Sequence, residues 1–334
     1  MKNNKIKSII QAFFTDLLFW IYLWGCFLYL INSWFEINLK TSFVIIAGLI
    51  FTIFFLTAGI SLGRKIFVPT KFTNIRWNKT FWGWSIIVVL AVTFIVGWKL
   101  VEVNPYKFFT QFKNAGGIMS GIFNPNLDIL IMSLTALAET IYLALLATLF
   151  AIPIAFVLSF FAARNLMPKT ILGNAVYVII RSIATLFRSI EAIVWAIIFS
   201  VWVGIGPFAG MLALMVHSIA SLTKLYSEQI ENIDTGPVEA IKATGATTLQ
   251  VWIFAVIPQI ISPYLAFTIY RWDINVRMAT IVGFVGGGGI GLMLLQQQQL
   301  LRWHNVGLII WLIAAVVWIM DMTSAKVREK LVEM

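Results

Sequence analysis

The sequence is poor in charged residues. Asp, Glu, Lys and Arg make up 11% of its 334 residues, whereas roughly a quarter of a soluble domain is charged. Hydrophobic residues make up 60%, and the mean hydropathy is +0.91. This balance excludes an ordinary soluble domain and predicts a membrane protein. The net charge of +10 would suggest nucleic acid in a soluble protein, but here the basic residues lie between apolar runs, so no nucleic-acid partner is expected.

Residues that support several kinds of chemistry are also scarce. Cys26 is the only cysteine, so an intrachain disulfide is impossible. His217 and His304 are the only histidines, and no carboxylate stands at metal-ligand spacing from them, so no metal site is expected. No GxxxxGK[ST] motif occurs, so the chain is expected to lack an ATP-hydrolysing P-loop of its own. Residues 286–291 match GxGxxG, but no preceding strand or suitably spaced acidic residue supports a dinucleotide site.

The apolar runs predict an all-α polytopic membrane protein. A spanning helix needs about 20 apolar residues. The uncharged stretch after residue 191 is cut near Gly204, and its first part is too short alone, so that span must reach back to residue 183 and include Arg188 and Glu191. Eight spans are predicted, at residues 17–35, 41–63, 81–98, 140–163, 183–203, 208–225, 249–270 and 303–320.

Basic residues predict the orientation of these spans. Lys and Arg gather at the N-terminus, at residues 64–79, at 164–169 and at the C-terminus, all on one side of an eight-span chain. The excess of Lys and Arg in short cytoplasmic loops places that side, with both termini, in the cytoplasm. The first apolar run has no small-residue cleavage site after it, so a retained anchor is expected.

Residues 278–301 are long and apolar enough to cross, but crossing would put the basic C-terminus outside. Their glycines disfavour a continuous helix, because each costs up to about 1 kcal/mol relative to Ala. A broken, re-entrant segment at the outer side is therefore expected, lining a cavity or buried in protein. Its glycines are Gly286, Gly287, Gly288, Gly289 and Gly291.

Residues 236–247 predict a short polar helix on the cytoplasmic side. Pro237 suits a first turn, Glu239 there complements the helix dipole, and Gly245 ends the helix after about two turns. So short a helix is marginal in water and must be held by packing. Ala240, Ala243 and residue 246 allow another surface to approach closely, which favours a docking helix for a soluble partner over a plain interfacial linker.

The spacing of Glu239, Ala240, Gly245, Ile257 and Pro258 resembles the EAA loop of binding-protein-dependent ABC importer permeases. Two positions depart from the family pattern: residue 241 is Ile and residue 255 is Ala. Residues 187–191 (FRSIE), 270–277 (YRWDINVR) and 286–291 are similar to the phosphonate branch of that family. The resemblance covers about residues 128–330, and phosphite, phosphate and related importers are similar.

The resemblance implies a permease subunit without its own catalytic site or cofactor. A five-span type I permease core would occupy residues 128–334, after a three-span extension and outer linker at 1–127. A second permease copy would complete the pathway in the bacterial inner membrane, as in a homodimer. A cytoplasmic ABC ATPase dimer, which binds ATP and Mg, would dock on the coupling helix, and an extracytoplasmic binding protein would deliver a phosphonate. The expected coupling residues are Glu239, Ala240, Lys242, Ala243 and Gly245.

Charged residues inside the spans are candidates for the pathway. Arg188 and Glu191 are three apart, so in one helix they would share a face and pair, as a structural ion pair or as a gate. Arg271, Asp273 and Arg277 are expected at the outer end of the seventh span, where they either anchor the helix at the interface or form an electropositive mouth for an oxyanion. The glycines from Gly286 to Gly291 would let the backbone approach that anion.

Two other classes of membrane protein would leave different patterns in the sequence. An ion-coupled secondary transporter needs intramembrane carboxylates and inverted repeats, and a membrane enzyme needs a converging polar cluster. Neither pattern is visible in the sequence.

Overall fold

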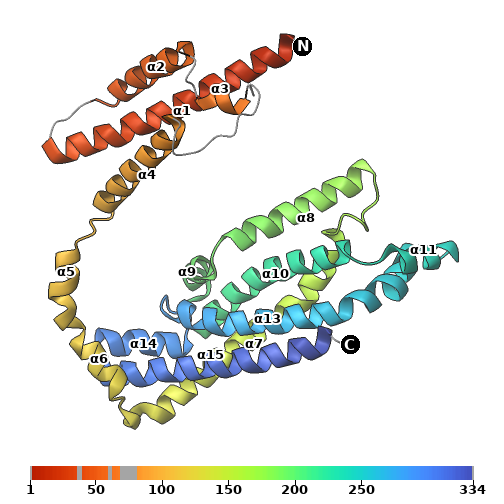
Figure 1. The fold of residues 1–334 in the computed structure, drawn as a ribbon. Helices are drawn as coiled ribbons and strands as arrows, with labels where there is room; N and C mark the ends of the chain where they lie inside the picture. The colour runs from red at the N-terminus through yellow and green to blue at the C-terminus, as the bar shows by residue number, and fades with distance from the viewer. Residues whose placement is uncertain (1, 36–39, 59–61, 68–80, 333–334) are drawn as a thin grey trace. The chain divides into compact units, whose positions relative to one another are not determined.

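The computed structural model describes residues 2–35, 40–58, 62–67 and 81–332, and the regular structure in these ranges is entirely helical. The chain divides into two compact units, Met1–Gln111 and Phe112–Met334 (Figure 1). Seven of the described helices are long and apolar enough to cross a membrane. Two further apolar helices are shorter, with 16 and 12 residues. The expected all-α architecture with about eight spans is therefore confirmed.

The first unit is built around one long helix. Its helices are α1 (Lys2–Phe35), α2 (Ser42–Thr57), α3 (Leu62–Phe67), α4 (Phe81–Leu100) and α5 (Pro105–Thr110). Helices α2, α3 and α4 each pack against α1. Aromatic rings join α1 to α2, with Trp20 stacked on Phe55 at 4.7 Å between ring centroids. Asp16 is fully buried and accepts a hydrogen bond from the Gly63 backbone N–H at 2.9 Å, which ties α3 to α1.

The second unit contains five long helices that pack together. Its elements are α6 (Gly116–Phe123), η3 (Leu127–Ile129), α7 (Leu130–Phe161), α8 (Ile171–Ser189), α9 (Ala192–Val203), α10 (Pro207–Glu231), α11 (Thr235–Ala243), α12 (Thr248–Val251), η4 (Trp252–Val256), α13 (Ile257–Gly283), α14 (Gly289–Gln299) and α15 (Trp303–Val332), after η2 (Gln111–Ala115) at the junction of the units. Helix α10 packs against α7, α8, α9 and α13. Within this unit, α11 and the C-terminal end of α15 lie toward one end, and α6 and α14 lie toward the other (Figure 1).

The expected single span at 183–203 is wrong. Helix α8 begins at Ile171 and ends at Ser189, and α9 begins separately at Ala192. Ile190 between them has an extended backbone, with φ −92° and ψ 120°. Arg181, in the middle of α8, pairs with Glu231 of α10 at 2.6 Å. Pairing lowers the cost of a charge in a membrane.

The expected end of the seventh span at Tyr270 is also wrong. Continuous helical structure runs from Thr248 through the π-helical turn η4 to Gly283. The expected break in residues 278–301 is present: α13 ends at Gly283 and α14 begins at Gly289. Gly286 and Gly288 adopt φ of +91° and +79°, a conformation that L side chains rarely take, so glycine is required in this turn.

Candidate functional site

A short helix, α11, is present where the coupling helix was expected, and its two ends are fixed by local chemistry. Asp234 caps its start by accepting a hydrogen bond from the Gly236 N–H at 3.0 Å. Gly245 follows the helix with φ +79°, the left-handed conformation that commonly ends helices. The helix covers residues 235–243, within the predicted range except for its first residue.

Helix α11 has one packed face and one open face. Val238 is buried and Ile241 is partly buried, and both pack against a hydrophobic cluster of α7, α10 and α13. Ile241 therefore has a structural reason to replace the Ala of the family pattern. Ala246 also packs inward, so the expectation that it admits another surface is wrong. Four of the expected coupling residues on the helix are exposed: Glu239, Ala240, Lys242 and Ala243.

Hydrogen bonds connect α11 firmly to the long helix that follows it. The Gln259 side chain, near the start of α13, accepts from the Asp234 backbone N–H at 3.0 Å and donates to the Asp234 carbonyl at 3.4 Å. It also donates to the Ala255 carbonyl at 2.7 Å. A force applied to the open face of α11 would therefore be transmitted to α13.

A layer of polar side chains crosses the middle of this unit. On its α11 side lies the cluster that contains Ala151, Leu222 and Tyr264, and on its other side lies a second cluster that contains Ala144, Leu214 and Val276. Between them on α7, α10 and α13 lie four buried polar residues: Thr148, Ser218, Arg271 and Asn275. Only 5% of Arg271 is exposed, and the other three are 2% exposed or less.

The structure therefore corrects the position of the charges on α13. Arg271 and Asp273 were expected at the outer end of a span, but they lie well inside α13, which continues to Gly283. Asp273 is 2% exposed. An interfacial anchor or an open mouth requires exposed side chains, so both interpretations are wrong for these two residues.

The expected pair of Arg188 and Glu191 is also wrong. Arg188 lies in the last turn of α8 and Glu191 immediately precedes α9, with the extended residue Ile190 between them, so the two do not share a helix face. No ion pair joins them among the described residues. Both nevertheless lie close enough to His217 to interact with it electrostatically, as does Arg271, and His217 bonds to the Ile190 carbonyl at 3.1 Å. The structure thus brings together candidates that the sequence treated separately.

Asp273 and Arg277 belong to a second charged group, on the side of α13 that faces α15. The Arg277 guanidinium donates to the Asp273 carboxylate at 2.6 Å and lies 3.3 Å from the Asp321 carboxylate of α15. Arg277 and Asp321 keep 42% and 48% of their side-chain surface exposed. Because Asp273 is paired in this way, it is not the counter-ion of Arg271.

The glycines at 286–291 are buried, and they face this chain itself. A Cβ on Gly291 would overlap the Thr280 carbonyl oxygen, and one on Gly287 would overlap the Val282 side chain. The expectation that this glycine segment offers its backbone to an anion is therefore wrong. Glu139 and Thr140 of α7 accept from the backbone N–H groups of residues 289 and 290, at 3.3 and 2.8 Å.

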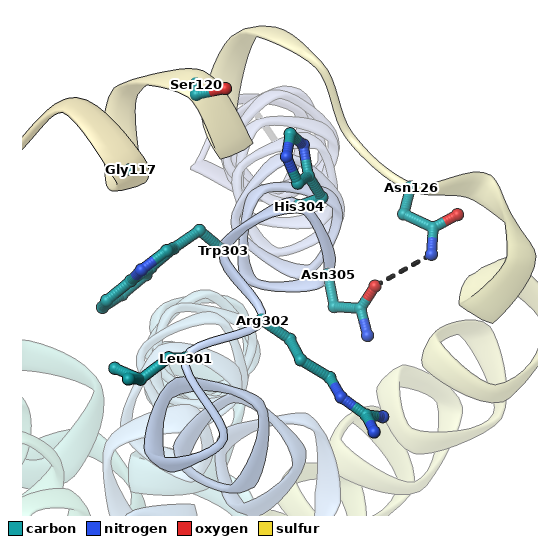
Figure 2. A pocket seen from close by; sticks show the side chains of 8 residues that line it. All are labelled: Gly117, Ser120, Asn126, Leu301, Arg302, Trp303, His304 and Asn305. Carbon is teal, nitrogen blue, oxygen red and sulfur yellow. Dashed lines mark hydrogen bonds between the residues drawn. The ribbon is translucent and has the colours of Figure 1, made fainter.

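A pocket of about 540 Å³ lies where α6 meets the α14–α15 turn, at the end of the unit away from α11 (Figure 2). Arg302 and Trp303 leave this turn on opposite sides of the chain (Figure 2). Asn305 accepts from the Asn126 side chain at 3.0 Å and donates to the Gln297 side chain at 2.7 Å. This ladder of side-chain hydrogen bonds gives Gln297, one of four consecutive glutamines at residues 296–299, a structural role that the sequence did not reveal.

We expect Asn305→Leu to lower the thermal stability of the protein, because Asn126 and the buried Gln297 would both lose a partner. Leaving a buried polar group unsatisfied costs about 1–3 kcal/mol. Ser120→Ala is the control, since Ser120 lines the same pocket and is exposed. Equal thermal midpoints for the two purified variants would contradict a structural role for the ladder.

No group of three or more His, Cys, Asp or Glu side chains suited to a metal ion occurs within residues 2–35, 40–58, 62–67 and 81–332. Sequence reasoning missed Thr148, Ser218, Asn275 and Glu139. Their hydrogen-bond partners lie on other helices or in the turn before α14, so no local spacing marks them.

Known structures support the fold. The chain is 23% identical to a solved structure of the MetNI methionine ABC transporter, with a TM-score of 0.52, over 62% of this chain and 99% of that chain. A second crystal form of the same transporter gives 22% identity and a TM-score of 0.50. At this identity the similarity shows the fold alone.

Sequence comparisons extend the similarity to the family. The chain is 31% identical to the phosphate-import permease protein PhnE of Mycolicibacterium smegmatis, over 85% of this chain but 54% of that relative. It is 31% identical to a putative phosphite transport system permease protein, HtxC, of Stutzerimonas stutzeri, over 72% of this chain and 84% of the relative. The phosphite transport system permease protein PtxC of the same organism is 35% identical over 58% of this chain and 69% of the relative. Residues 155–324 match the family described as binding-protein-dependent transport system inner membrane component. This multi-span membrane protein therefore belongs to the family of binding-protein-dependent inner membrane transport components.

Proposed function

We propose that this chain is the permease subunit of an ABC importer, and that its substrate is a small tetrahedral phosphorus oxyanion. A phosphonate is the substrate that the sequence motifs favour, with phosphite and phosphate as alternatives. The relatives support this class, since they are named for phosphate and phosphite transport. The three anions share a tetrahedral phosphorus centre with several oxygen acceptors.

The observation that carries the proposal is the construction of α11. Its packed face and its ties to α13 hold a short helix that would be marginal in water. The opposite face presents Glu239, Ala240 and Lys242 to a partner. A cytoplasmic ABC ATPase dimer would dock on this face, bind ATP and Mg, and transmit its closure through α11 to α13.

The remaining parts of the importer follow from this assignment. Both termini and α11 would lie in the cytoplasm, and the end that carries the pocket at Trp303 would face outward. An extracytoplasmic binding protein would deliver the anion there. Two permease copies would enclose the pathway, and the exposed charges Arg188, Glu191 and Arg277 would then be shielded from lipid, where a charged side chain is costly.

The purified chain alone is expected to hydrolyse no ATP, because its sequence has no P-loop. Co-purification with a cognate ATPase should restore hydrolysis, and a P-loop Lys→Ala variant of that ATPase should abolish it. ATP turnover by the permease after every other polypeptide has been removed would contradict the proposal. Failure to recover any ATPase with the permease would favour an ion-coupled transporter instead.

A further inference from the structure

Arg271 is a buried cation whose guanidinium group is only partly hydrogen-bonded. Its Nε donates to the Ser218 hydroxyl at 3.0 Å, whereas its Nη2 is buried and has no hydrogen-bond partner among the described residues. A buried charged group with an unused donor is costly, far more so than a neutral one. Such a group is kept in a membrane-spanning segment mainly where function requires it.

The charge of Arg271 is also not neutralised by direct contact. Asp273 lies two residues away, on the opposite side of α13, and forms its ion pair with Arg277. Glu191 at the start of α9 is near enough to interact electrostatically, but it forms no ion pair with Arg271. The side of α13 that carries Arg271 therefore has a positive charge at the level of the polar layer.

Three polar side chains fix the direction of the guanidinium. The Thr148 hydroxyl donates to the Ala144 carbonyl at 2.8 Å, so its oxygen can only accept from the Asn275 side-chain N–H, which lies 2.8 Å away. This orients the amide of Asn275, whose nitrogen also donates to the Ser218 hydroxyl oxygen at 2.8 Å. Ser218 is thereby held as the acceptor for Arg271 Nε.

A guanidinium held at Nε has its terminal nitrogens unpaired among the described residues, although the burial of Nη2 means that the surrounding helices must move apart before an anion can reach it. Two such nitrogens match two oxygens of a tetrahedral oxyanion, and charge-assisted hydrogen bonds of this kind are about twice as strong as neutral ones. Because Ser218 and Asn275 are neutral, they orient Arg271 without cancelling its charge. A carboxylate in their place would occupy the arginine permanently.

We propose that Arg271 is a binding site for a phosphorus oxyanion in transit, and that Ser218, Asn275 and Thr148 are positioning residues that hold it ready. The site lies in the middle of the permease, between the two hydrophobic clusters, and its use depends on the proposed function. Binding would satisfy the Nη2 donor, and the nearby Glu191 would keep the anion from being held too tightly to leave.

The alternative is that Arg271 only supports the fold. The thermal stability of a variant distinguishes this structural role from anion binding. If Arg271 is a structural support, Arg271→Met should lower the thermal midpoint. If it is a binding site, that variant should leave the midpoint unchanged or raise it, because replacing an incompletely satisfied buried charge with an apolar side chain of similar volume is often stabilising.

The experiment measures uptake of radiolabelled methylphosphonate by proteoliposomes that contain the permease, its ATPase and its binding protein. Uptake is expressed per folded, assembled complex. We expect Arg271→Met to reduce it at least about tenfold, the effect of losing one charge-assisted hydrogen bond to the anion. Ser218→Ala should reduce it about three- to tenfold, and Ser218→Thr, which restores a hydroxyl, should recover most of it.

Ser221→Ala is the matched control, since it removes a buried hydroxyl one turn further along α10 and should leave uptake at the parental rate. Parental uptake per complex in Arg271→Met, or equal effects of Ser218→Ala and Ser221→Ala, would overturn the inference. If the parental complex imports no phosphorus oxyanion at all, the proposed function fails instead, and the two failures are thereby distinguished.

Discussion

Gly245→Trp is expected to abolish ATP-driven uptake while leaving the chain inserted in the membrane. Gly245 has φ +79°, and a non-glycine residue in this left-handed conformation costs roughly 1–2 kcal/mol. No atom lies within 4 Å of the position that a Cβ would take, so a side chain there begins in open space, and we expect the indole to project from the surface next to α11. There it would obstruct the docking of an ATPase. Recovery of the ATPase with tagged permease and uptake in proteoliposomes are the two measurements.

Gly245→Asn separates the two effects of that change. Asn tolerates the left-handed conformation better than other side chains and is much smaller than Trp. It should therefore retain most of the ATPase recovery and most of the uptake. If Gly245→Trp assembles and transports like the parent, α11 is a linker helix and not the coupling element.

Gly291→Ala is expected to prevent recovery of a folded permease. A Cβ at this position would overlap the Thr280 carbonyl oxygen and would approach Gly283 of α13, so α14 would have to move away from α13. Overpacking of this kind costs about 3 kcal/mol or more when backbone has to shift. The fraction of monodisperse protein after detergent extraction, and its thermal midpoint, measure the effect.

Gly97→Ala is the control for that substitution. Gly97 lies in α4, and no atom lies within 4 Å of the position of its Cβ. Replacing a helical glycine with alanine in open space should stabilise the helix by up to about 1 kcal/mol. Similar recovery of Gly291→Ala and Gly97→Ala would show that α14 does not pack as tightly on α13 as the structure indicates.

Local signals in the sequence were sufficient for the features that depend on neighbouring residues. Apolar runs located most of the long helices, because crossing a membrane requires an unbroken apolar stretch. Helix α11 was predictable because local residues mark its first turn and its end, Pro237 and Gly245. The break before α14 was predictable from its glycines for the same reason.

The features that the sequence did not reveal depend on distant partners. The separation of α8 from α9 was not predictable from the length of the apolar run, and α8 is held to α10 by the pair of Arg181 with Glu231, 50 residues further along the chain. An apolar run stops at charged residues even where the helix continues. For this reason Arg271 and Asp273 led to the prediction that the seventh span ends at Tyr270. The orientation of Arg271 depends on Ser218 and Thr148, which belong to two other helices, so only the folded chain shows the group.

ATP-dependent uptake in a fully defined system tests the central claim most directly. Proteoliposomes containing the permease and its ATPase, with ATP inside or outside as orientation requires, would receive the binding protein loaded with radiolabelled methylphosphonate, phosphite or phosphate. The account predicts that at least one of these anions is imported, and only when permease, ATPase, binding protein and ATP are all present. Import that continues without the ATPase, or ATP-driven import of a different class of solute with none of the three anions transported, would contradict it.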